Sequence, residues 1–102
     1  MEPAIDLDHL EAATFGDRAL QREVLELFST QADKLLRTIR ESEGKPRIEA
    51  AHALKGAAHG VGAFAVANIA ERVEQGDVGA IDPLEGCLAR VREAAAALSA
   101  KD

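Results

Sequence analysis

Apolar residues recur at intervals of three and four along most of the chain, which is the spacing of one face of an amphipathic helix. The longest such run extends from about residue 17 to 40 and predicts one long helix. Its predicted apolar face consists of Leu20, Val24, Leu27, Phe28, Leu35 and Ile39. Ahead of this run, Asp8-His9-Leu10-Glu11 has the spacing of a capping box. A short first helix is therefore expected to begin near Asp8 and to end by Gly16.

Glycine and proline mark the places where this pattern breaks. The segment Gly44-Lys45-Pro46 interrupts it, and proline fits best at a first helical position, where its missing amide costs nothing. A third helix is therefore predicted from Pro46 to about His59. The glycines at positions 60 and 62 are expected to weaken or bend this helix. Apolar spacing then resumes and predicts a fourth helix that ends at Gly76.

The segment Asp82-Pro83-Leu84-Glu85 combines an N-cap, a proline at the first helical position and a capping glutamate. It predicts a last helix that frays near Lys101, with apolar positions at Leu84, Leu88, Val91, Ala95 and Leu98. Four substantial helices with short connections imply an all-α fold, an antiparallel four-helix bundle with a short additional N-terminal helix. One domain covering residues 1–102 is expected, because this length suits a single core.

Composition and charge narrow the classes of function. The formal net charge is −6. A protein that binds nucleic acid or an anionic membrane surface needs a basic stripe, so both kinds of partner are disfavoured. No apolar run approaches the roughly 20 residues of a membrane span, and the first residues lack the features of a signal peptide. A cytoplasmic protein is expected, with Cys87 as a small buried hydrophobe. A monomer is favoured because one bundle can bury the apolar faces of its own helices.

His52 lies on the polar side of the predicted third helix. At about 100° per residue, Leu54 falls roughly 200° from His52 and marks the buried side. Lys55, Gly56 and His59 all fall within about 60° of His52, on the opposite face. This placement argues against a buried core histidine, since such a residue would lie on the same side as Leu54. An ordinary surface histidine is the remaining alternative.

An exposed imidazole has an unperturbed pKa of about 6.5, so much of it is neutral near pH 7. The neutral ring is a competent nucleophile. His52 could therefore accept a phosphoryl group, and Lys55, one turn on, would place an ammonium near the phosphoryl oxygens. Gly56 leaves the ring uncrowded, although a glycine inside a helix costs about 1 kcal/mol relative to alanine. Taken singly, Lys55 is also explained as a solvated residue and Gly56 as a tolerated weakness of the helix.

The run His52-Ala53-Leu54-Lys55-Gly56-Ala57-Ala58, followed by Gly62-Ala63 and then Glu74, closely resembles the signature of histidine-containing phosphotransfer (HPt) domains. The likeness covers almost the whole chain. It includes Ile5-Asp6-Leu7, Phe15-Gly16-Asp17 and the long helix with Leu27-Phe28, and the central motif is far more specific than these flanks.

The resemblance implies that His52 is the phosphoacceptor, that Lys55 assists the phosphoryl oxygens and that Gly56 opens the approach for a partner. That partner is a receiver domain of a response regulator or hybrid histidine kinase, whose own aspartate and bound Mg²⁺ supply the catalytic machinery. The domain itself would hold no cofactor and no metal. It would carry phosphoryl groups from one receiver to another in a two-component phosphorelay, without kinase or phosphatase activity of its own.

Four neighbouring positions carry less specific expectations. Glu74 stands where the family often has a polar residue near the histidine, so it either orients the ring by accepting a hydrogen bond or is a solvated helix-end residue. Ile48 is an apolar residue on the exposed stripe and is expected to contact the receiver. His59 lies roughly 10 Å from His52, too far to share a metal ion, and is an interface residue or has no special role. Ala57 replaces a hydroxyl residue common in the family, which should not prevent transfer.

Other functions are less consistent with the chain. Gly56, Gly60 and Gly62 form a pattern resembling a dinucleotide-binding loop, but such glycines follow a β-strand, which is not predicted here. A histidine kinase is excluded because no ATP-binding domain accompanies the acceptor histidine. The remaining alternative is a helical adaptor that binds receiver or kinase domains without transferring phosphate. The presence of both His52 and Lys55 favours transfer.

Overall fold

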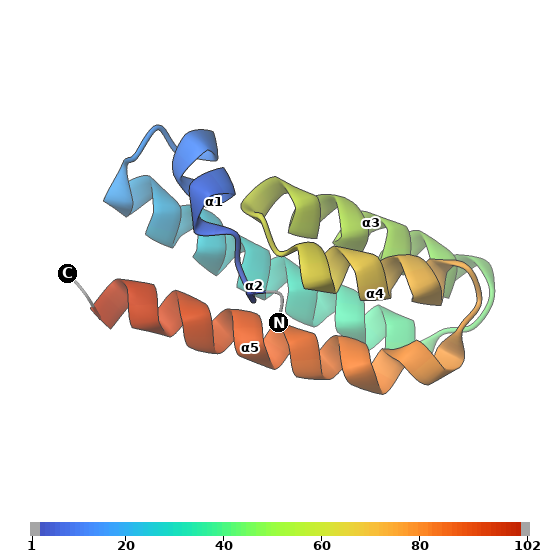
Figure 1. Ribbon diagram of the computed structural model, residues 1–102. Helices are drawn as coiled ribbons and strands as arrows, with labels where there is room; N and C mark the ends of the chain where they lie inside the picture. The colour runs from blue at the N-terminus through green and yellow to red at the C-terminus, as the bar shows by residue number, and fades with distance from the viewer. Residues whose placement is uncertain (1–2, 101–102) are drawn as a thin grey trace.

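The computed structural model describes residues 3–100, and these form helices and their connections (Figure 1). The elements are α1 (Leu7–Ala13), α2 (Arg18–Glu41), α3 (Lys45–Val61), α4 (Phe64–Glu74), the 3₁₀ turn η1 (Val78–Ala80) and α5 (Ile81–Ala100). Helices α2 to α5 alternate in direction and each packs against two of the others, so that they enclose one core. The short α1 lies at one end, against α3. The predicted fold class, an antiparallel four-helix bundle with a short additional N-terminal helix, is confirmed.

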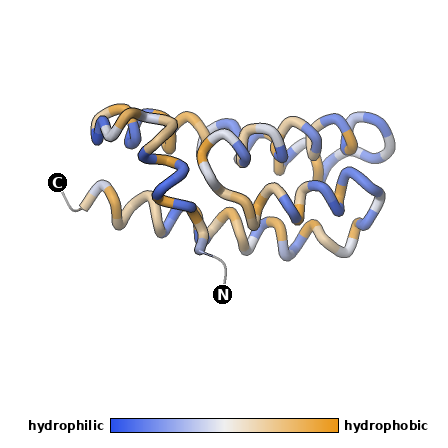
Figure 2. The backbone as a smooth tube through the Cα atoms, turned by 45° about the horizontal axis from the view of Figure 1, so that its top comes forward, coloured by the Kyte–Doolittle hydropathy of each residue, from blue (hydrophilic) through white to orange (hydrophobic). Residues whose placement is uncertain are grey.

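The core receives large apolar side chains from all four long helices, among them Phe28, Leu54, Val73 and Leu88. Hydrophobic and hydrophilic positions alternate along each helix, as Figure 2 shows. Many buried residues of α3, α4 and the turn between them are alanine, namely Ala50, Ala51, Ala58, Ala63, Ala67 and Ala70. Small side chains let two helix backbones approach closely, and this brings polar residues at the edge of the α3–α4 contact within reach of one another.

The buried face of α2 differs from the predicted one. Its buried residues are Leu25, Phe28, Ala32, Leu36 and Ile39. Leu27, for which the apolar spacing predicts a place in the core, is 66% exposed, and Val24 and Leu35 are only half-buried. Apolar residues occupy a wide arc of this helix, and the contacts with α3 and α5 bury only its centre. Leu27 therefore lies at the rim of the bundle.

The first helix has a different cap from the one predicted. Its N-cap is Asp6, whose Oδ1 accepts a hydrogen bond of 3.1 Å from the backbone N–H of His9. Asp8 lies in the first turn, one residue past the start. The N–H of Asp6 also donates to the carbonyl oxygen of Gly62 at 2.9 Å, which fixes the start of α1 against the end of α3. The helix ends before Gly16, as expected.

The third and fourth helices begin and end close to the predicted residues. Helix α3 starts at Lys45, directly before Pro46, and extends two residues past His59. Gly62 ends it with a left-handed conformation at φ +82°, which glycine adopts without the strain that a Cβ brings. Helix α4 ends at Glu74, two residues before Gly76.

The start of α5 corrects another prediction. The helix begins at Ile81 directly after η1, so Asp82 lies inside the first turn and does not cap it. The carboxylate of Asp82 instead accepts a hydrogen bond of 2.8 Å from Arg40 at the end of α2, and Glu85 accepts another at 3.2 Å. Arg40 therefore joins the ends of α2 and α5. Within residues 3–100, the structure contains no helix long and apolar enough to cross a membrane.

Candidate functional site

His52 lies in the middle of α3, with its side chain 67% exposed. Leu54, two residues on, is completely buried in the core. The exposed position of the ring agrees with the helical arrangement predicted from the sequence, and it leaves the imidazole open to a second protein.

Glu74, the last residue of α4, contacts two side chains of α3 with one carboxylate. Its Oε2 lies 2.7 Å from Nδ1 of His52, and its Oε1 lies 2.7 Å from Nζ of Lys55. The Glu74 and Lys55 side chains are each 23% exposed, so both are partly covered by the bundle. The structure thus brings together three of the residues singled out in the sequence.

The sequence explains how this cluster forms. His52 and Lys55 are three residues apart in α3 and therefore share one face of the helix. Helices α3 and α4 pack against each other, and Glu74 at the end of α4 lies opposite His52 and Lys55. A carboxylate in the last turn of a helix is disfavoured by the helix dipole, and the ammonium of Lys55 offsets that repulsion.

The charges of the cluster follow from these contacts. The hydrogen bond from Lys55 holds the pKa of Glu74 below its usual value, with a smaller contribution in the same direction from His52. The same hydrogen bond raises the pKa of Lys55 above its usual value. Partial burial opposes both pKa shifts without reversing either. At neutral pH, Glu74 is therefore an anion and Lys55 a cation.

This charge state determines which nitrogen of His52 is available for reaction. An ionised carboxylate only accepts hydrogen bonds, so Nδ1 of His52 must carry the hydrogen that it shares with Glu74. In the neutral ring, Nε2 then has a free lone pair. The ring is thus arranged as a nucleophile at Nε2.

The remaining predicted residues surround this cluster in different ways. Gly56 is exposed, and a Cβ built on it would meet no atom within 4 Å. Ile48 is 43% exposed. The ring of His59 is exposed and packs against Phe64, with ring centroids 5.7 Å apart. His59 is thus in contact with the start of α4, beside the α3–α4 turn.

Sequence reasoning missed an apolar surface that borders α3. Val24, Leu27 and Phe28 of α2 and Ala57 and Val61 of α3 line an open hollow of about 200 Å³. Leu27 is the most exposed of them. The spacing of apolar residues along α2 places Leu27 in the core and gives no sign of this surface. Only its position at the edge of the apolar arc could have indicated a surface role.

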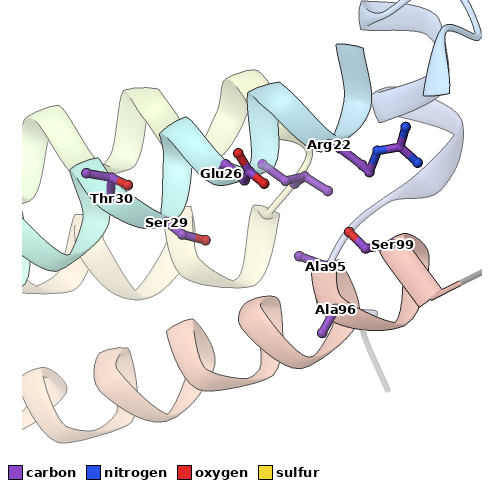
Figure 3. A pocket seen from close by; sticks show the side chains of 8 residues that line it. Arg22, Glu26, Ser29, Thr30, Ala95, Ala96 and Ser99 are labelled. Carbon is purple, nitrogen blue, oxygen red and sulfur yellow. The ribbon is translucent and has the colours of Figure 1, made fainter. Parts of the chain in front are cut away.

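A second open hollow, of about 440 Å³, lies between α2 and α5 near the C-terminal end of α5. Figure 3 shows polar and charged side chains of α2, such as Glu26, opposite the small side chains Ala95, Ala96 and Ser99 of α5. Neither His52 nor Glu74 lines this hollow. The candidate site is therefore separate from it and lies on the outer surface of α3 and α4.

The fold and the site together define a helical bundle that presents an exposed histidine, His52, whose ring contacts a carboxylate of the adjacent helix. A family model describing the Hpt domain matches residues 23–101, a range that begins inside α2 and includes α3, α4 and the whole cluster. The chain therefore belongs to the Hpt domain family. Hpt domains are phosphocarrier modules of histidine phosphorelays and generally interact with receiver domains of response regulators or kinases. Searches of curated proteins and of solved structures gave no match.

Proposed function

We propose that this chain accepts a phosphoryl group on Nε2 of His52 from the phosphorylated aspartate of a receiver domain, and passes it to another receiver in a two-component phosphorelay. One observation carries the proposal: in a chain of the Hpt family, Glu74 engages Nδ1 of an exposed histidine and leaves Nε2 available.

The transfer step requires no proton movement at His52. The Nε2 lone pair attacks the phosphorus of the aspartyl phosphate, the P–O bond to the aspartate breaks, and its electron pair stays on the aspartate carboxylate. The hydrogen on Nδ1 remains in its bond to Glu74, so the phosphorylated ring carries a positive charge next to that carboxylate. Transfer to a second receiver reverses these steps and returns the ring to the same tautomer.

The receiver supplies the reactive aspartate and Mg²⁺, and this chain supplies an oriented nucleophile. We therefore propose a phosphoryl carrier with no kinase or phosphatase activity of its own, acting as a monomer in the cytoplasm. The charges of Glu74 and Lys55 balance each other beside the ring, so the approaching phosphoryl dianion meets no net negative charge from this pair.

The receiver docks on the outer surface of α3 and the adjoining part of α2. Gly56 presents no side chain there, which leaves room next to His52. Ile48 and Leu27 are exposed apolar residues of the kind that anchor protein interfaces. His59 completes the same stripe of α3 two turns beyond His52. Leu27→Ser should therefore weaken receiver binding while the bundle keeps its stability, since this side chain is already 66% exposed.

The proposal is tested by mixing the protein with a ³²P-labelled phosphorylated receiver domain and Mg²⁺. The wild type should acquire label that is labile in acid and stable in alkali, and ¹⁵N NMR should place the phosphorus on Nε2. His52→Gln should acquire none, whereas His59→Gln, the same substitution on the same helix, should be labelled normally.

Two results would contradict the proposal. Label that persists on His52→Gln would assign the acceptor to another residue. A wild-type protein that binds the phosphorylated receivers tested but never becomes labelled would instead be the non-transferring adaptor considered above.

A further inference from the structure

Lys55 lies where it can act on His52 through a third residue. Its Nζ is 2.7 Å from Oε1 of Glu74, and the other oxygen of the same carboxylate is 2.7 Å from Nδ1 of His52. The ammonium therefore stands on the Nδ1 side of the ring, whereas the phosphoryl group of the proposed reaction is attached at Nε2. A phosphoryl group at Nε2 would have to compete with Glu74 for this ammonium.

The surroundings favour the lysine staying where it is. Lys55 is attracted by Glu71 as well as by Glu74, and both residues belong to α4. The Lys55 and Glu74 side chains are only 23% exposed, which weakens the competition of water for their contact. The approaching phosphoryl group thus competes for Lys55 against two carboxylates already in place.

The negative charge of Glu74 must be balanced if the ring of His52 is to stay unprotonated at Nε2, and Lys55 supplies the balancing positive charge. An unbalanced carboxylate 2.7 Å from an imidazole nitrogen favours the doubly protonated ring, in which Nε2 has no lone pair and cannot attack phosphorus. A cation on the other oxygen of that carboxylate reduces its pull on the second proton. The hydrogen bond at Nδ1 is kept, while the tendency to add a second proton at Nε2 is reduced.

We propose that Lys55 is a positioning residue that acts on His52 through Glu74: it balances the carboxylate charge so that Glu74 orients the ring without holding it protonated. This inference rests on the proposed transfer at His52 and specifies how its nucleophile is maintained. It differs from the expectation drawn from the family resemblance, in which Lys55 assists the phosphoryl oxygens directly. In this arrangement, the effect of Lys55 depends on the charge at position 74.

The test compares four proteins: the wild type, Lys55→Met, Glu74→Gln, and the double variant. Glutamine keeps an oxygen that can accept the Nδ1 hydrogen bond but carries no charge to balance. Lys55→Met should slow acceptance of phosphate at pH 7 by about fivefold or more when Glu74 is present, a coupling within the range measured for contacting residues. In the Glu74→Gln background, the same change should alter the rate by less than about twofold.

The pH profile distinguishes positioning from a general loss of structure. The acceptance rate of Lys55→Met should recover towards that of the wild type as the pH is raised from 7 to 9, because the excess proton then leaves the ring. Lys55→Arg keeps a cation beside Glu74 and should retain most of the rate at pH 7. Circular dichroism of each variant checks that the helices are intact.

The outcomes separate this inference from the proposed function. Equal losses from Lys55→Met in both backgrounds, independent of pH, would assign Lys55 to the phosphoryl group itself and overturn the inference. No loss in either background would overturn it as well. If the wild type accepts no phosphate, the proposed function fails, and ¹⁵N NMR titration of the His52 ring in the same four proteins still decides the inference. The ring's titration must then move to higher pH in Lys55→Met alone and stay in place in the Glu74→Gln background.

Discussion

Replacing Gly56 by alanine should make the protein more stable and a poorer phosphoryl acceptor. Gly56 lies inside α3, where alanine is favoured over glycine by about 1 kcal/mol. The added Cβ would meet no atom within 4 Å, so no steric cost offsets this gain. The expected increase in the free energy of unfolding is about 0.5–1 kcal/mol, which in a domain of this size raises Tm by roughly 2–8 °C. Urea and thermal denaturation followed by circular dichroism measure it.

The loss of function has a different origin. Residue 56 is one turn beyond His52 on the same face, so a side chain there would stand in the path by which the proposed receiver approaches. Gly56→Ala should slow transfer, and Gly56→Leu should slow it further, without loss of helix content. Gly86 provides the matched control, because it is also exposed, lies inside a helix, and an added Cβ there would likewise meet no atom within 4 Å. Gly86→Ala should give a similar gain in stability and leave transfer unchanged.

Two results would refute this reasoning. A Gly56→Ala protein that is less stable than the wild type would show that the space around residue 56 is needed within the fold. A Gly56→Leu protein that is stable and transfers at the wild-type rate would show that glycine has no role in access to His52.

Three further substitutions test the fold and the cluster. Leu54→Ala removes a completely buried side chain and should lower the free energy of unfolding by about 2–5 kcal/mol in urea titrations; a loss below about 1 kcal/mol would contradict its place in the core. Gly62→Ala should cost more than about 1 kcal/mol, because φ is +82° and the new Cβ would lie 3.0 Å from the Asp6 carbonyl oxygen; an unchanged melting curve would contradict that contact. Lys55 lowers the pKa of Glu74, so the contribution of Glu74 to stability is present above the unfolded value of about 4.3 and is lost as the pH falls through the lowered folded value. Glu74→Gln should flatten that part of the stability–pH curve, and an identical acid limb in both proteins would show that this carboxylate adds nothing.

Helix boundaries set by local chemistry were predictable from sequence. Gly62 and Gly76 end helices close to the expected residues because a left-handed conformation depends mainly on the residue that adopts it. The prediction for Asp82 is wrong because an acidic residue beside a proline has the local signature of a cap, whereas its actual partner, Arg40, is 42 residues away. Contacts over such a distance depend on how whole helices pack, which no local pattern encodes.

The same distinction applies to the candidate site. His52, Lys55 and Gly56 share a face because helical geometry alone puts them there. Glu74 belongs to another helix, and its family position indicated proximity to the histidine without showing that one carboxylate would bind two side chains. The prediction for Leu27 is wrong because apolar spacing identifies an amphipathic helix but does not show which part of a wide apolar arc its neighbours will cover.

The hairpin formed by α3 and α4 contains His52 and both residues of its cluster within one continuous segment, from Lys45 to Glu74. The turn between the two helices is tight, because α3 ends at Val61 and α4 begins at Phe64. A transplant of this segment into another bundle would therefore carry His52 together with both residues of its cluster. The receiving helices would have to cover the apolar side of the hairpin, as α2 and α5 do here.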